Sequence, residues 1–164
     1  MVSVRYFLLT LIFCFSPLSA ADGTAPMLEG NDVFSGRAVR LSDYRDKVVL
    51  VDFWASWCPP CLESLPAWEA LRQELGPRGF EVIAVNVDEN TSDGLDFLRE
   101  RPVSYPVLAD PEGRIGIPWG IRTLPRYFLV DTQGNIVSDH RRFRSRDVEG
   151  LRSEILELLH SKTH

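Results

Sequence analysis

Two cysteines that enclose a pair of prolines are the residues best suited to chemistry in this sequence. They are Cys58 and Cys61 of the segment Trp57-Cys58-Pro59-Pro60-Cys61, which follows an apolar run and opens a predicted helix. A cysteine at a helix N-terminus faces free N–H groups and the positive end of the helix dipole, which stabilise a thiolate. The cysteine three residues later lies on the same helical face and can attack a mixed disulfide. The spacing therefore predicts Cys58 as nucleophile, Cys61 as resolving thiol, and a redox-active disulfide between them.

Two other roles for this cysteine pair remain open: a structural bridge and half of a zinc site. A bridge that closes so short a loop stabilises a fold little, because it removes little entropy from the unfolded chain. A zinc site needs two further ligands, and the three histidines, His140, His160 and His164, form no paired motif with the cysteines. We therefore favour redox chemistry, and expect no metal and no cofactor beyond the disulfide itself.

An acidic residue inside an apolar run is the next candidate. Asp52 interrupts the segment 48–54, which is otherwise apolar and rich in β-branched residues. A buried carboxylate is costly unless it serves a purpose. We expect Asp52 to have a raised pKa and to pass a proton to or from Cys61. The alternative is an aspartate whose oxygens are satisfied by local backbone groups at the strand end.

Tryptophans flank the cysteines on the N-terminal side. Trp57 is suited to form an apolar wall against which a partner docks, whereas core packing explains Trp54 and Trp57 equally well. Trp119, next to Gly120, is expected in the core, because large aromatic side chains are highly buried on average.

The elements that must position these residues follow from hydrophobic patterning. The segment 48–54 predicts a strand buried on both faces, and the helix from Pro59 to about Leu75 ends before Gly76-Pro77. With a strand over 80–87 these form a βαβ unit whose strands are parallel. Further predicted elements are a hairpin over 33–41, a helix over 92–101, an extended piece over 106–108, strands over 127–131 and 136–142, and a closing helix over 145–160. We expect a central mixed sheet with helices on both faces.

The N-terminus and the overall charge limit where the protein works and what it binds. Residues 1–21 contain one charge, an apolar run and small residues before Ala21, which predicts a secretory signal peptide cleaved near Ala21. An uncleaved membrane anchor is the alternative. A flexible lead-in over 22–32 and a single domain over 33–164 should follow. The net charge of −5 and the pI of about 5.2 argue against a nucleic-acid binder, which needs a basic face.

The segment 49–61 resembles the active-site segment of thioredoxins, most closely the exported TlpA/ResA-like thiol–disulfide oxidoreductases. The likeness continues upstream through 40–44 and downstream through 85–88, 105–110 and 124–131. It implies an α/β thioredoxin fold with an N-terminal hairpin and an inserted βα element.

The resemblance also implies roles for particular residues. Pro125 matches the cis-proline that packs beside the two cysteines, so that the backbone of Leu124 pairs with an extended substrate. Asp52 matches the buried acid of thioredoxins. TlpA/ResA-like proteins often carry a glutamate three residues after the second cysteine. This sequence has Ser64 there, and Glu63 is expected to point away, because one residue turns a helical side chain by about 100°.

The function that the resemblance implies is an exported, periplasmic dithiol reductant of protein disulfides, recharged by a membrane thiol carrier. An oxidase or isomerase would use the same residues in the other direction. Less favoured alternatives are a copper chaperone, which would hold Cu(I) on Cys58 and Cys61, and a cytochrome assembly factor.

Overall fold

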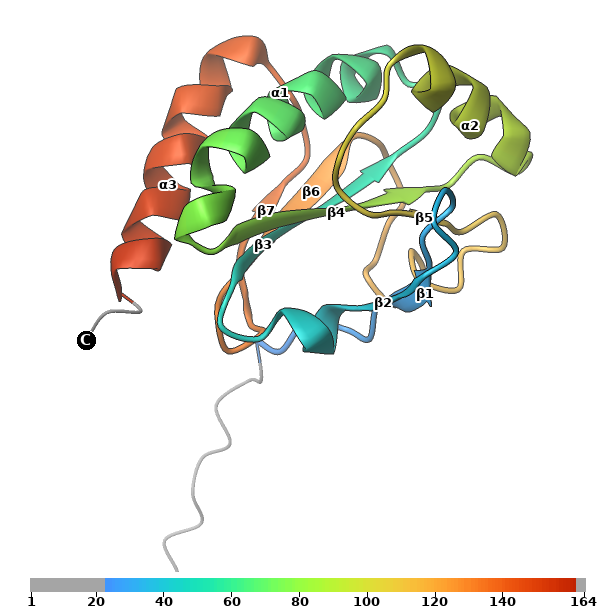
Figure 1. The fold of residues 1–164 in the computed structure, drawn as a ribbon. Helices are drawn as coiled ribbons and strands as arrows, with labels where there is room; N and C mark the ends of the chain where they lie inside the picture. Colours follow the sequence, from blue (N-terminus) through green and yellow to red (C-terminus); the bar gives the residue numbers. More distant parts are fainter. Residues whose placement is uncertain (1–22, 162–164) are drawn as a thin grey trace, which may run out of the picture.

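The computed structural model describes residues 23–161, which form one mixed sheet covered on both faces (Figure 1). The sheet has the strand order β5-β4-β3-β6-β7. Its strands are β3 (Val48–Trp54), β4 (Phe80–Asn86), β5 (Val107–Ala109), β6 (Arg126–Val130) and β7 (Ile136–His140). The helices are α1 (Pro59–Leu75), α2 (Thr91–Glu100) and α3 (Val148–Ser161), with short 3₁₀ turns η1 (Leu41–Tyr44), η2 (Gly76–Arg78) and η3 (Ser145–Asp147).

Strand β3 is the centre of the fold because its neighbours pair with it on both sides. It runs parallel to β4 and antiparallel to β6, and all seven of its residues are buried. A run of β-branched and aromatic residues suits this position, since such side chains pack well on a pleated surface. The predicted parallel βαβ unit of β3, α1 and β4 is therefore confirmed, and it places the cysteines at the carboxyl end of the central strand.

The layering differs from the expectation of helices on both faces. Side chains of α1, α2 and α3 share one core with Leu50 and Trp54 of β3, so that these three helices of the described chain cover a single face (Figure 1). The opposite face packs against Leu28, Val39 and Trp119, which belong to the N-terminal segment and to a loop over 110–121. That loop contains three glycines and two prolines, residues that disfavour a helix.

The N-terminal hairpin begins earlier than predicted. Its strands are β1 (Glu29–Asn31) and β2 (Ala38–Arg40), with the turn between them. Residues 23–28 are also tied to the domain, because Leu28 is buried and the Ala25 N–H donates to the Gly134 carbonyl. Most of the expected lead-in therefore packs on the sheet. The predicted signal peptide lies outside the described residues. The inserted element is α2 followed by β5.

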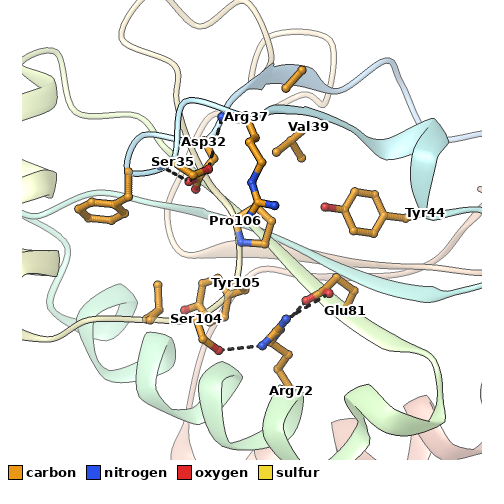
Figure 2. A pocket seen from close by; sticks show the side chains of 13 residues that line it. Asp32, Ser35, Arg37, Val39, Tyr44, Arg72, Glu81, Ser104, Tyr105 and Pro106 are labelled. Carbon is orange, nitrogen blue, oxygen red and sulfur yellow. Dashed lines mark hydrogen bonds and ion pairs between the residues drawn. The ribbon is translucent and has the colours of Figure 1, made fainter.

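A cavity of about 390 Å³ lies at the end of the sheet away from the cysteines, between the hairpin and the segment 103–106 (Figure 2). Two of the charged residues that line it, Arg72 and Glu81, pair with each other. The Arg72 Nε donates to Glu81 at 2.6 Å, and the same guanidinium donates to the Ser104 hydroxyl at 2.8 Å. These contacts fasten the C-terminal half of α1 to β4. None of the helices within residues 23–161 is both long and apolar enough to cross a membrane.

Candidate active site

A disulfide joins Cys58 and Cys61 at the start of α1. Cys58 is the residue in front of the helix, and its Cα lies 5.3 Å from that of Cys61. Cys58 is 5% exposed, whereas Cys61 is fully buried. Of the two cysteines, only Cys58 therefore keeps any exposed surface, which agrees with its predicted role as nucleophile and with Cys61 as resolving thiol.

The first turn of α1 offers fewer free donors than the sequence suggested. Pro59 and Pro60 have no N–H, and the N–H groups of Cys61 and Leu62 both donate to the Cys58 carbonyl, at 2.9 and 3.1 Å. The free N–H groups expected to face the Cys58 sulfur are thus missing from these positions. The helix dipole remains as the feature of this terminus that favours a Cys58 thiolate.

Asp52 lies under α1 on β3 and is fully buried. Burial raises its pKa to about 7, and the nearby indole of Trp68 offsets part of that rise. The contact with Trp68 falls short of a well-formed hydrogen bond, and no other described residue donates to either Asp52 oxygen. The predicted direction of the pKa shift is confirmed. The alternative of a carboxylate satisfied by local backbone groups is wrong, since no backbone N–H of the described residues donates to either oxygen.

The charge of Asp52 contributes to the raised pKa of two nearby tyrosines, Tyr105 and Tyr127. The hydroxyls of both tyrosines donate to backbone carbonyls rather than to Asp52. Burial, together with the charge of Asp52, raises the pKa of Tyr105 above its usual range. The Tyr105 hydroxyl donates to the Leu65 carbonyl of α1 at 3.1 Å. Tyr127 is paired in register with Asp52, and burial is the main cause that raises its pKa to about 12. Its hydroxyl donates to the Arg142 carbonyl. Neither tyrosine hydroxyl therefore donates to Asp52.

Cys61 faces the same core as the aromatic residues around Asp52. It belongs to the cluster that contains Leu65 and Trp68, the inward side chains of the next two turns of α1. Glu63 is exposed, as predicted, while the buried Ser64 hydroxyl donates to the Cys61 carbonyl at 2.8 Å. Within this part of the chain, Asp52 is the acid on the Cys61 side of the helix.

The bond between Leu124 and Pro125 is cis, as the resemblance implied. Leu124 lines a cavity of about 230 Å³ together with Trp57, Ile117 and Ile121. Trp57 is 67% exposed and Trp54 is fully buried, so the two tryptophans divide into a surface residue and a core residue. Trp119 is buried, as predicted. No backbone hydrogen bond joins Leu124 to another residue of the described chain.

Sequence reasoning missed two groups of residues at this end of the sheet. Ile117 is 73% exposed beside Trp57, on a loop held by two N–H bonds to the buried carboxylate of Asp110. The buried Asp88 accepts hydrogen bonds from the N–H and hydroxyl of Ser56. Asp88 carried a signal that could have been used, namely an acidic residue directly after a buried strand. Its partner 32 residues away could not be read from the sequence.

The sequence pattern of the Redoxin family matches residues 21–155, most of the chain. The chain belongs to the Redoxin family. The chain is similar to the thiol-disulfide oxidoreductase ResA of Geobacillus thermodenitrificans, to which it is 33% identical over 117 residues. The match covers 71% of this chain and 67% of the relative. The ResA of Bacillus thuringiensis subsp. konkukian is 31% identical over 104 residues, and the match spans only 60% of its length.

Solved structures share the fold described above. A Chlorobium tepidum protein assigned as the thiol:disulfide interchange protein DsbE is 36% identical, with a TM-score of 0.79 over 84% of this chain and 96% of that one. The thioredoxin domain of a thiol-disulfide oxidoreductase from Bacteroides vulgatus is 26% identical, with a TM-score of 0.71 over 83% of this chain and 98% of the other. The thioredoxin-like fold expected for this Redoxin family member is thereby confirmed.

Proposed function

We propose that this protein is a thiol–disulfide oxidoreductase that reduces disulfides of exported proteins. The observation that carries the proposal is the disulfide at the start of α1, of which only Cys58 reaches the surface. The names of the ResA relatives and of the DsbE-type structure support the same chemistry. A structural bridge is disfavoured because it would add little stability over so short a loop.

The reaction divides into two exchanges. The Cys58 thiolate attacks one sulfur of a substrate disulfide, a mixed disulfide forms, and the other substrate sulfur leaves as a thiolate that takes up a proton. The Asp52 carboxylate then accepts the proton of the Cys61 thiol, and the Cys61 sulfur attacks Cys58. The remaining substrate thiolate leaves, and two electrons have passed to the substrate. A pKa of about 7 suits Asp52 to this role, because both of its forms are populated near neutral pH.

The reducing direction is favoured by the first turn of α1. A strongly oxidising pair needs a stabilised thiolate, because that stabilises its reduced form. Here Pro59 and Pro60 remove two N–H donors, and the next two N–H groups are engaged by the Cys58 carbonyl. The reduced form therefore lacks direct hydrogen bonds from this turn. An oxidase or isomerase remains the second candidate.

The cavity beside Trp57 is suited to an extended stretch of substrate. No backbone group within residues 23–161 bonds to the backbone of Leu124, and the side chains of Trp57 and Ile117 leave apolar surface exposed. We infer that the substrate backbone pairs with Leu124 next to Pro125, while an apolar side chain near the substrate cysteine rests between Trp57 and Ile117.

Export and recharging complete the proposal. Residues 1–21 would direct the protein out of the cytoplasm, and a membrane thiol carrier would return two electrons to the Cys58–Cys61 disulfide. The pattern of residues 1–21 supports export, and the resemblance to TlpA/ResA-like proteins supports the membrane thiol carrier. A copper chaperone would instead bind Cu(I) through the reduced pair, which a Cu(I) titration detects.

Trapping tests the proposal directly. Cys61→Ser should leave Cys58 joined to a disulfide-bonded substrate, and mass spectrometry should find the adduct on Cys58. Cys58→Ser is the matched control and should form no adduct at Cys61, since that sulfur is buried. Equal adducts on both single variants would refute the assignment of Cys58 as nucleophile.

The direction is decided by the reduction potential against glutathione. A value near −270 mV agrees with a reductant, whereas a value near −120 mV would make the protein an oxidant. The second result would leave the exchange chemistry in place and reverse its direction.

A further inference from the structure

We propose that Asp88 is a positioning residue for Cys58, and that the inserted helix α2 acts on it through Asn86. This inference rests on the proposed role of Cys58 as nucleophile. Asp88, Asn86 and Gly94 thereby gain a role, although they belong neither to the disulfide nor to the cis-proline.

Asp88 clamps the loop in front of the disulfide. It is buried, and its two oxygens accept from the Ser56 N–H at 3.2 and 3.0 Å and from the Ser56 hydroxyl at 3.0 Å. Ser56 is two residues before Cys58, whose own N–H donates to the Ala55 carbonyl at 3.1 Å. The backbone that leads into Cys58 is thus fixed on both sides of Ser56.

The clamp is oriented from the side of α2. The Asn86 side-chain amide donates to Asp88 at 2.7 Å. Gly94 of α2 lies directly over this amide, because a Cβ built on Gly94 would stand 2.5 Å from the Asn86 Nδ2. A glycine inside a helix lowers its stability, so its presence here agrees with a need for close approach. A chain of contacts therefore runs from α2 through Asn86, Asp88 and Ser56 to Cys58.

The position of Cys58 relative to the helix axis matters because the first turn of α1 offers its thiolate no free N–H donor. Its carbonyl already occupies the N–H groups of Cys61 and Leu62, and the two prolines have none. The helix dipole is left to favour the thiolate, and that effect falls off within one turn. A shift of the loop away from the helix axis should therefore make Cys58 less acidic.

The test is the pH dependence of Cys58 alkylation in the reduced full chain, with the label assigned to each cysteine by fragment-ion mass spectrometry. Asp88→Asn should raise the midpoint by about half a pH unit, a partial loss of the helix-terminus effect, and slow alkylation below the midpoint about threefold. The sign is diagnostic. Removing a negative charge without moving the loop would lower the midpoint, so a lowered or unchanged midpoint overturns the proposal.

Two glycine variants in the helices test the same path without changing Asp88, whose substitution could itself disturb the fold. Gly94→Ala should push Asn86 and raise the Cys58 midpoint in the same direction. Gly150→Ala in α3 is the matched control, because nothing lies within 4 Å of its added Cβ, and it should leave the midpoint unchanged. Equal midpoints for the two glycine variants would exclude the path through α2.

The wild-type protein separates failure of this inference from failure of the proposed function. An ordinary Cys58 midpoint near 8.5 in the wild type would refute the nucleophile itself. A lowered wild-type midpoint that Asp88→Asn leaves in place would refute only the positioning role.

Discussion

Two buried carboxylates belong to neighbouring parts of the same sheet, Asp52 within β3 and Asp88 in the loop after β4, and their surroundings differ. Asp52 stands in the middle of β3 under α1, and neither of its oxygens has a hydrogen-bond partner among the described residues. Asp88 lies two residues beyond the carboxyl end of β4 and accepts hydrogen bonds from Ser56 and Asn86. One carboxylate is left free to change its proton, whereas the other is used to hold a loop.

The same residue type behaves differently in these two surroundings. An unpartnered buried carboxylate is unstable when charged, and burial accordingly raises the pKa of Asp52 to about 7. A carboxylate with several donors instead fixes the groups that donate to it. The two residues should therefore respond in opposite ways to the same substitution, to asparagine.

The largest expected effect is on stability through Asp52. Because folding raises the Asp52 pKa, the folded protein holds a proton that the unfolded chain releases between about pH 4 and 7. Stability should fall as the pH rises through this window. Asp52→Asn should recover about 3–4 kcal/mol at pH 8 and nothing at pH 4. Urea unfolding at both pH values measures this, and a variant less stable at pH 8 would contradict the account of Asp52.

The second effect is on turnover. Asp52→Asn should slow release of substrate from the mixed disulfide by up to about a hundredfold near pH 7, because proton transfer is lost. Stopped-flow measurement of the second exchange reports this step separately from the attack by Cys58, which should be unaffected. Loss of both steps in equal measure would place Asp52 outside the proton transfer.

The third effect has the opposite sign for stability. Asp88→Asn should destabilise the fold by about 2 kcal/mol at pH 7, because an amide nitrogen would face the donors of Ser56 or Asn86. Asp110→Asn is a control of the same kind, since Asp110 also accepts from two backbone N–H groups. If Asp88→Asn stabilised the fold as Asp52→Asn does, the contrast between the two sites would be lost.

A smaller effect is expected where the clamped loop meets substrate. Trp57→Ala should raise KM for an apolar peptide disulfide about fivefold and leave kcat unchanged, which corresponds to about 1 kcal/mol of binding. Trp57→Phe should keep most of the affinity. A drop in kcat with an unchanged KM would mean that Trp57 acts on the chemistry rather than on docking.

The smallest effect concerns the first turn of α1. Pro60→Ala restores one N–H and should lower the Cys58 alkylation midpoint by about half a pH unit. The reduction potential should become more oxidising by about 15 mV, because the reduced form is stabilised. An unchanged potential would show that the missing donor does not set the redox balance.

The central elements could be predicted because their signals are local. The apolar run of β3, the helix that opens at Pro59 and the resemblance around Cys58 gave the strand, α1 and the disulfide. The buried position of Asp52 followed from its place in that run. The layering could not be predicted in this way, because it depends on which face of the sheet α2 and the 110–121 loop cover. The contact of Asp88 with Ser56 joins residues far apart in the sequence.

The chain enters the fold at the end of the sheet remote from its sulfur chemistry. The Ile136 N–H donates to the Gly23 carbonyl, and the β6–β7 turn beside it lies next to the first residue pairs of β3 (Figure 1). The seven residues of β3 separate the two ends by about 23 Å, at 3.3 Å per residue. Gly23 and the Cys58–Cys61 disulfide therefore lie at opposite ends of the central strand, so that the whole length of the sheet separates the first described residues from the redox pair.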